Sequence, residues 1–306
     1  MAKHIRFLSL LALALAGTAS ARIIVGGEVV EPGDPLAKFT VRIFSDLGDP
    51  NGKKLKACTG TLIAKDLVLT AAHCTADENH RFVKNTATLR IHFNRFETDT
   101  LNPDSSTSIA AKQIIVAGGY FDANGVAVDP TQNVIFPKDN DIALLVLSED
   151  APEGFYPIPL ARAWEVTDYA ETLTVAGYGL EGSSENSRDG RLKSARVPLS
   201  MLGNNWYYSR VVTDYGTGNV CSGDSGGPLL IQTPNEGYKL AGVNNIAYSR
   251  CLDGNQSVRI EDYSEFLTRA MRSLGDHSKP NFTAPAKGKL ERLKKQLKEQ
   301  FEEYLD

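Results

Sequence analysis

The sequence has little of several features that mark common protein classes. Only 4 of its 306 residues are cysteine and only 5 are histidine, and acidic residues outnumber basic ones to give a formal net charge of -4. This balance argues against binding to nucleic acid, which needs an excess of basic residues on one surface. No repeat with a period of about 20 to 50 residues is present, so a repeat array is excluded.

Long apolar segments are also lacking. The run at residues 7–16 is about ten residues long, against the roughly twenty that cross a bilayer, and no later segment is long enough either. Two basic residues, Lys3 and Arg6, precede this run, and the small residues of 19–21 follow it. This is the pattern of a secretory signal peptide. We therefore expect residues 1–21 to be a signal peptide and the mature chain to be secreted into an extracellular or periplasmic space.

The cysteines show no C-x-x-C pair. They are Cys58, Cys74, Cys221 and Cys251. This spacing does not favour a zinc site, and we expect neither a metal nor a cofactor. Export into an oxidising compartment, together with an even number of cysteines, predicts two disulfides. Four cysteines allow three pairings, and the residues alone do not choose among them.

Short β-rich runs separated by turn residues dominate the chain. Strands are predicted at residues 39–44, 60–63, 67–70, 87–93, 142–147 and 173–176. Because turn segments are frequent between them, the pattern favours an antiparallel all-β sandwich or barrel over alternating βαβ units. A helix is expected only late, over residues 262–274, where apolar side chains recur at helical spacing after an acidic start.

One serine lies between glycines, in the segment Gly-Asp-Ser-Gly-Gly at 223–227. Taken alone, this segment matches the nucleophile elbow of α/β-hydrolases, in which the catalytic histidine follows the serine. Only His277 follows Ser225 here, and it lies in a linker beyond the last predicted element. A general base must be held within hydrogen-bond reach of its nucleophile, so this alternative is excluded.

A histidine, an aspartate and this serine occur in three recognisable segments. These are residues 70–74 (Thr-Ala-Ala-His-Cys), 141–145 (Asp-Ile-Ala-Leu-Leu) and 223–229 (Gly-Asp-Ser-Gly-Gly-Pro-Leu). With these segments in this order, the chain resembles the chymotrypsin-like serine peptidases. Ile-Val-Gly-Gly at 24–27 extends the resemblance, which spans roughly residues 22–275.

The resemblance implies a fold and a domain organisation. The fold is all-β, with two antiparallel six-stranded β-barrels of the chymotrypsin type and a C-terminal helix. The peptidase domain would occupy residues 22–275, a linker 276–288 and an amphipathic C-terminal helix 289–306. The resemblance also implies the disulfides Cys58–Cys74 and Cys221–Cys251, each of which would hold one catalytic segment in place.

The resemblance also assigns catalytic roles. A serine hydroxyl is a weak nucleophile and needs a base beside it. His73 is expected to be that base, with Asp141 orienting its imidazole and Ser225 as the nucleophile. Asp139 lies nearby, but only Asp141 opens an apolar strand run. The backbone N–H groups of Gly223 and Ser225 are expected to form the oxyanion hole.

Substrate preference depends on the residue six positions before the serine. In trypsin-like members this residue is an aspartate that pairs with a basic substrate side chain, whereas here it is Asn219. A neutral amide does not offset the desolvation of a cation as a carboxylate does. With Ala247 narrowing the pocket and Ser257 near its far wall, we expect neutral, small to medium side chains before the cleaved bond. Asp253 is the alternative, because its carboxylate would restore a negative charge.

An activation site is expected near Arg22. The resemblance implies that a freed amino terminus pairs with Asp224 and thereby sets the oxyanion turn. The family pattern begins at Ile24, whereas a cut after Arg22 frees Ile23, one residue earlier. An ammonium must approach its carboxylate closely to offset desolvation, so this register matters. We expect the exported chain to be a zymogen that cleavage after Arg22 activates, with Ile23 and Ile24 as the candidates for insertion.

The end of the chain changes character after the linker. Residues 289–306 place an apolar stripe on one face at helical spacing, formed by Leu290, Leu293, Leu297, Phe301, Tyr304 and Leu305. Four contacts remain open for this face: docking on the peptidase domain itself, self-association, a partner groove and a membrane surface.

These patterns together predict a secreted serine endopeptidase that cleaves proteins or peptides through an acyl-enzyme. The alternative from another class is a catalytically silent, protease-like binding protein. Such a protein usually lacks a catalytic residue, whereas this chain has His73, Asp141 and Ser225. Ester substrates also remain open, because the three catalytic residues do not distinguish the acyl group.

Overall fold

The computed structural model describes most of the chain between residues 24 and 282. The described residues are 24, 27–31, 33–46, 55–77, 79–93, 108–125, 127, 140–169, 173–180, 190–203, 206–210, 218–248, 251, 253–275 and 280–282. Ile23, the predicted signal peptide at 1–21 and the predicted helix at 289–306 lie outside them. Within this part of the chain, no helix has the length and apolar character needed to cross a membrane.

A closed barrel of six antiparallel strands forms the first half of the molecule. The strands follow the order β2-β3-β4-β7-β6-β5 around the barrel. They are β2 (Thr40–Asp46), β3 (Leu55–Ala64), β4 (Leu67–Thr70), β5 (Leu89–His92), β6 (Ser108–Val116) and β7 (Ala143–Leu147). The sequence predicted all of these except β6, whose two exposed central residues, Lys112 and Gln113, interrupt the alternation of buried and exposed positions.

Eight antiparallel strands form a sheet in the second half, in the order β1-β9-β8-β12-β13-β14-β11-β10. They are β1 (Glu28–Val29), β8 (Thr174–Gly177), β9 (Lys193–Arg196), β10 (Leu199–Leu202), β11 (Trp206–Arg210), β12 (Pro228–Thr233), β13 (Gly237–Ala247) and β14 (Gly254–Arg259). The chymotrypsin type of fold is confirmed, but this half is an eight-stranded sheet rather than a closed six-stranded barrel. β1 adds a strand at one end by pairing with β9, β10 adds one at the other by pairing with β11, and among the described residues no pairing between these two ends closes the sheet.

The predicted late helix is confirmed as α2 (Ser264–Ser273). Its apolar face, formed by Leu267, Ala270 and Met271, is buried in the main hydrophobic core. The final helix of the described chain therefore packs back onto the barrel, although the second sheet precedes it in sequence.

A second helix, α1 (Ala163–Asp168), was not predicted. Side-chain carboxylates hold its first turn: Arg162 N–H donates to Glu165 Oε2 at 2.9 Å, and Ala163 N–H donates to a carboxylate oxygen of Glu261. Because Glu261 is distant in sequence and the helix has only six residues, its stability comes from tertiary contacts rather than from a periodic pattern.

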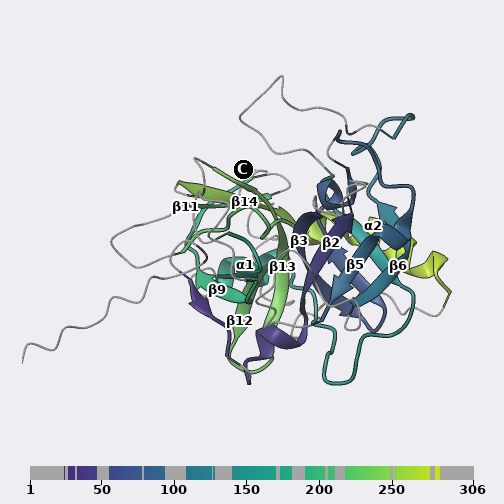
Figure 1. Cartoon of the computed structure of the whole chain (residues 1–306). Helices are drawn as coiled ribbons and strands as arrows, with labels where there is room; N and C mark the ends of the chain where they lie inside the picture. Colours follow the sequence, from purple (N-terminus) through teal and green to yellow (C-terminus); the bar gives the residue numbers. More distant parts are fainter. Residues whose placement is uncertain are drawn as a thin grey trace, which may run out of the picture.

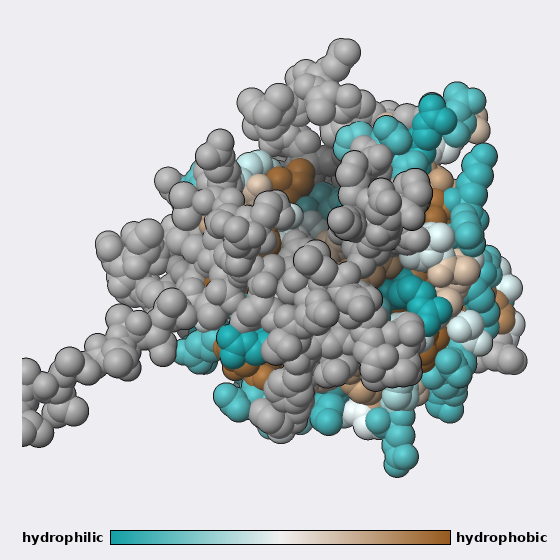
Figure 2. Space-filling model, viewed as in Figure 1, coloured by the Kyte–Doolittle hydropathy of each residue, from teal (hydrophilic) through white to brown (hydrophobic). Residues whose placement is uncertain are grey.

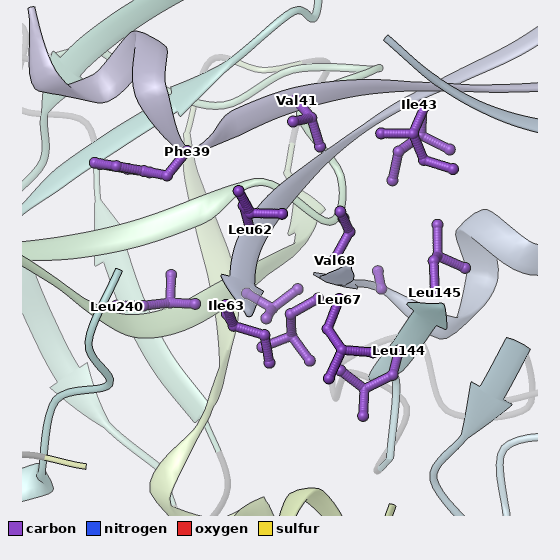
Figure 3. Close-up of a cluster of buried hydrophobic side chains, with 14 of the residues drawn as sticks. Phe39, Val41, Ile43, Leu62, Ile63, Leu67, Val68, Leu144, Leu145 and Leu240 are labelled. Atoms are coloured by element: carbon purple, nitrogen blue, oxygen red, sulfur yellow. The ribbon is translucent and has the colours of Figure 1, made fainter. Parts of the chain in front are cut away.

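The main hydrophobic core joins the two halves. In Figure 3, Phe39 and Leu62 of the first half lie beside Leu240 of β13, while Leu144 and Leu145 of β7 lie on the barrel side. None of these five side chains is more than 2% exposed. Because the barrel and the sheet share this core, their relative position is fixed, and so is the position of the loops between them.

The two halves appear as two groups of strands in Figure 1, with β2, β3, β5 and β6 in one and β9, β11, β12 and β13 in the other. Figure 2 shows the same side of the molecule, and the apolar residues that are coloured in it appear as small areas beside hydrophilic ones. The large exposed hydrophobic side chains of the described chain are Tyr156, Met201 and Leu202.

Candidate active site

Asp141 holds His73 through two hydrogen bonds. Asp141 Oδ1 accepts the backbone N–H of His73 at 2.8 Å, and Asp141 Oδ2 lies 2.8 Å from His73 Nδ1. Only 2% of the Asp141 side chain is exposed, against 26% of the His73 side chain. A buried carboxylate that accepts from Nδ1 selects the imidazole tautomer whose Nε2 is free to take up a proton.

Strand pairing explains why these residues meet. His73 lies in a 3₁₀ turn, Ala72–Thr75, that follows β4, and Asp141 lies just before β7. β4 and β7 are antiparallel neighbours with Thr70 opposite Ala143. The end of one strand therefore lies beside the start of the other, which brings residues 68 positions apart into contact.

Ser225 lies in the turn that precedes β12. Its carbonyl oxygen accepts the N–H of Thr59 at 2.9 Å and lies 3.5 Å from Cys74 Sγ. Cys74 directly follows His73, so the serine and histidine segments touch. Ser225 Oγ approaches Asn245 O only at 3.5 Å, at the limit of a hydrogen bond. The hydroxyl is therefore weakly held and partly exposed beside the histidine segment.

The turn around Ser225 leaves two backbone N–H groups without acceptors. Gly223 has a φ of 101°, in the left-handed region that glycine tolerates. The N–H of Asp224, between Gly223 and Ser225, donates to Cys221 O at 3.0 Å. Within the described part of the chain, the N–H groups of Gly223 and Ser225 have no such partner. These are the two donors that the sequence analysis expected in the oxyanion hole.

A buried carboxylate, that of Asp224, lies beneath this turn. Asp224 is 0% exposed, and its oxygens accept Gly179 N–H at 2.7 Å and Cys221 N–H at 2.8 Å. A Cβ at position 179 would lie 2.5 Å from Asp224 Cγ, so glycine is required there. Of the predicted activation residues, Ile24 is 2% exposed and packs in one apolar cluster with Val220, close in sequence to Asp224.

Two of the predicted pocket residues approach one end of β14. Asn219 is 1% exposed, and its Nδ2 donates to Gly254 O at 3.3 Å. Ala247 of β13 lies opposite Asn255, the next residue of β14. Asn219 and Ala247 thus meet the same short segment, from two different parts of the chain.

Ser257, the third predicted pocket residue, lies deeper in the sheet. It is 0% exposed, and its Oγ donates to Asn244 Oδ1 at 2.9 Å. Asn244 Nδ2 in turn donates to Pro228 O at 3.3 Å. Ser257 is therefore part of a polar chain that supports the segment after Ser225.

Both disulfides implied by the resemblance are present, Cys58–Cys74 and Cys221–Cys251. The first joins β3 to the histidine turn, and the second fixes the start of the serine turn. Cys58, His73 and Cys74 also place potential metal-ligand atoms within 4.8 Å of one another. Sulfur atoms in a disulfide are not the thiolates that bind zinc, so this group does not favour a metal site.

Lys56 and Thr59 also contact the site, although the sequence analysis did not single them out. Lys56 Nζ donates to His73 O at 2.5 Å and to Ala76 O at 3.3 Å, which closes the histidine turn. Burial lowers the pKa of Lys56, against the opposing effect of the Asp141 carboxylate. The sequence held one sign that these residues lie near the site. They lie on either side of Cys58, whose predicted disulfide partner, Cys74, directly follows His73.

Comparison with known families agrees with this arrangement. The family model described as trypsin matches residues 24–267, most of the chain. The chain belongs to the trypsin family. Members of the trypsin family are serine proteases, which are hydrolases, and the His73, Asp141 and Ser225 segments fall within the matched residues.

Several curated proteins are similar to this trypsin-family chain. Vitamin K-dependent protein C of Rattus norvegicus is 27% identical over 203 residues, which cover 59% of this chain and 38% of that protein. CLIP domain-containing serine protease B10 of Anopheles gambiae is 31% identical over 231 residues, covering 68% and 59% respectively. Serine protease filzig of Drosophila melanogaster is 27% identical over 203 residues, covering 61% and 11%. The chain thus spans less than two thirds of the length of these relatives.

The lowered pKa of Lys56 predicts a pH-dependent stability difference between the protein and Lys56→Met. Between the lowered folded-state pKa and the ordinary value of 10.5, the unfolded chain binds more protons at Lys56 than the folded protein does. The free energy of unfolding of the protein, relative to Lys56→Met, should therefore rise as the pH approaches 10.5. Urea unfolding of both proteins in a Ser225→Ala background, which prevents self-cleavage, measures this difference.

Lys65→Met provides the matched control, because the Lys65 side chain is 81% exposed. The difference in free energy of unfolding between Lys65→Met and the parent protein should stay constant over the same pH range. If the corresponding difference for Lys56→Met is also constant with pH, burial does not lower the pKa of Lys56 as described.

Proposed function

We propose that this trypsin-family chain is a secreted serine endopeptidase that uses His73, Asp141 and Ser225. The observation that supports this most is the pair of hydrogen bonds that join the Asp141 carboxylate to the backbone N–H and to Nδ1 of His73, while Ser225 contacts Cys74. A structural histidine does not need a buried carboxylate on Nδ1 and a partly exposed ring on a segment that touches a weakly held serine.

The proposed reaction begins with attack of Ser225 Oγ on a peptide carbonyl carbon. His73 Nε2 takes the hydroxyl proton, and the negative charge on the carbonyl oxygen is stabilised by the N–H groups of Gly223 and Ser225. The C–N bond then breaks, the proton passes from His73 to the leaving amine, and the acyl group remains on Ser225. Water attacks this ester with His73 again as the base, which releases the acid and restores the serine.

Substitution of Ser225 distinguishes this enzyme from a silent binding protein. Ser225→Ala should lose peptide hydrolysis by at least about a thousandfold, because no other group supplies the nucleophile. The parent protein should be labelled at Ser225 by a fluorophosphonate, with the site read by mass spectrometry, and Ser225→Ala should not. Ser273→Ala, a substitution in α2, is the control and should keep both properties. A processed parent protein that never reacts at Ser225 would support the binding protein.

We further propose a neutral specificity pocket with Asn219 at its base. Asn219 Nδ2 donates to Gly254 O, whereas Asn219 Oδ1 has no partner among the described residues. A neutral oxygen does not offset the desolvation of an arginine or lysine side chain. Ala247 replaces the usual glycine of the family, so its methyl group restricts large rings.

Asn219→Asp should move the substrate preference toward arginine and lysine. The new carboxylate pairs with the substrate cation, so kcat/KM for a basic residue should rise at least about tenfold relative to that for a neutral one. Cleavage of a peptide library by the protein and by the variant measures the change, with Asp253→Asn as the comparison for the other carboxylate near the pocket. Dominant cleavage after arginine or lysine by the unaltered protein would refute the neutral pocket.

Activation by cleavage after Arg22 is part of the proposal. Ile24, two residues after Arg22, is buried in one apolar cluster with Val220, which is close in sequence to Asp224. A new ammonium at this end of the chain would meet the buried Asp224 carboxylate and hold the turn that carries Gly223 and Ser225.

Amino-terminal sequencing of the fluorophosphonate-reactive species tests this cut. We expect Ile23 as the first residue, and Arg22→Gln should remain unreactive because a trypsin-like activating protease needs the basic side chain. A reactive species that begins at Arg22 would overturn the zymogen proposal.

We also propose a domain organisation for the whole chain and a class of substrate. Residues 1–21 would direct export, 22–275 would form the peptidase domain, and 276–288 would link it to an amphipathic helix at 289–306. Proteins or peptides are the proposed substrates, and the helix would contact the peptidase domain, another copy, a partner or a membrane surface.

A further inference from the structure

Thr59 of β3 bonds to two carbonyl groups of the turn that carries Ser225. Its Oγ1 donates to Gly223 O at 2.9 Å, and its backbone N–H donates to Ser225 O at 2.9 Å. Thr59 is 0% exposed and lies 164 positions from Gly223 in the sequence. One barrel residue thus holds the carbonyls of the same two residues whose N–H groups face the proposed oxyanion.

The direction of the Thr59 hydroxyl is fixed by its partners. The N–H of Tyr178 donates to Thr59 Oγ1 at 3.2 Å. A backbone N–H only donates and a carbonyl oxygen only accepts, so the hydroxyl must accept from Tyr178 and donate to Gly223. The Thr59 carbonyl is itself held by Thr70 Oγ1 at 2.9 Å. The residue is therefore anchored on several sides before it reaches the turn.

Gly223 is the point at which such an anchor matters. Its φ of 101° is one of many conformations open to glycine, so its own backbone preference does not fix the N–H direction. A bond to its carbonyl fixes the peptide group that follows, and Leu180 N–H fixes the one before through Ser222 O at 2.9 Å. The Gly223 N–H belongs to the Ser222–Gly223 peptide group, which Leu180 holds, and Thr59 holds the Gly223–Asp224 group. The two bonds together fix the torsion angles of Gly223, and hence the orientation of its N–H relative to the rest of the serine turn.

We infer that Thr59 is a positioning residue for the oxyanion hole: its hydroxyl holds the Gly223–Asp224 peptide group, which fixes the torsion angles of Gly223 and so the direction of the Gly223 N–H relative to the Ser225 N–H. This inference rests on the proposed function of Ser225 as the nucleophile. Thr59 touches neither substrate nor reacting atoms, so its effect is expressed through Gly223. The hydroxyl acts in the transition state, where the oxygen carries negative charge, and not in the binding of uncharged substrate.

The alternative is that the hydroxyl merely satisfies buried polar groups. The kcat and aldehyde measurements below test this alternative, and Thr61, which lies on the same strand and is 1% exposed, controls for the loss of a buried β3 hydroxyl as such. Among the described residues, Thr61 Oγ1 has no hydrogen-bond partner. Thr61→Val thus removes a buried threonine hydroxyl from β3 without removing a contact to the serine turn.

The experiment compares Thr59→Val, which removes the hydroxyl at nearly constant shape, with Thr59→Ser, which keeps it. Thr59→Val should lower kcat about 10- to 100-fold while KM changes by less than about threefold, since the two oxyanion donors are no longer held in one orientation relative to each other. Binding of a peptide aldehyde, which forms a tetrahedral oxyanion on Ser225, should weaken by a similar factor. Thr59→Ser should restore most of kcat, and Thr61→Val should match the parent protein.

Each outcome bears on the inference. If Thr59→Val does not fold, as judged by circular dichroism, Thr59→Ala supplies the same comparison without a second branched methyl group. If Thr59→Val has the same kcat as Thr61→Val, or loses kcat with unchanged aldehyde affinity, the inference is overturned but the proposed function is not. A parent protein that never reacts with fluorophosphonate at Ser225 overturns the proposed function and this inference with it.

Discussion

The contact between β3 and the serine turn is the constraint on which the rest of the site depends. β3 belongs to the barrel, whereas the turn leads into β12 of the sheet, so their bonds cross the boundary between the halves. Lys56 and Cys58 hold the histidine turn, and Thr59 holds Gly223 and Ser225. Within four residues, one strand thus contacts both the histidine turn and the serine turn. The shared core around Leu240 keeps this strand and the turn at a constant separation.

Two buried carboxylates on either side of this boundary illustrate a second constraint. Asp141 and Asp224 are 1% and 0% exposed, and burial of a charge is costly unless hydrogen bonds satisfy it. Each accepts backbone N–H groups: Asp141 from His73, and Asp224 from Gly179 and Cys221. Each carboxylate therefore orders the chain around it. Asp141 orders the proposed base, and Asp224 orders the turn beside the proposed nucleophile.

Much of the fold and the site could be predicted from the sequence, and the failures have physical causes. The strand at 67–70 and the late helix carry clear local patterns, as does the segment around each catalytic residue. α1 was missed because Glu261, far away in sequence, holds its first turn. The second half differs from a closed six-stranded barrel because the short strands β1 and β10 extend its ends. Two-residue pairing such as that of β1 leaves no periodic signal.

The sequence by itself determined which residues are proposed to carry the chemistry, because side-chain type and order along the chain are local properties. His73, Asp141, Ser225 and the glycine at 223 were recognisable in this way. The tertiary structure alone decided which groups hold them, since hydrogen-bond partners depend on approach in space. Thr59 is an ordinary buried strand residue in sequence, and only the packing of barrel against sheet brings its hydroxyl to Gly223 O. Asn219 likewise acquires its partner, Gly254 O, only when β14 is in place.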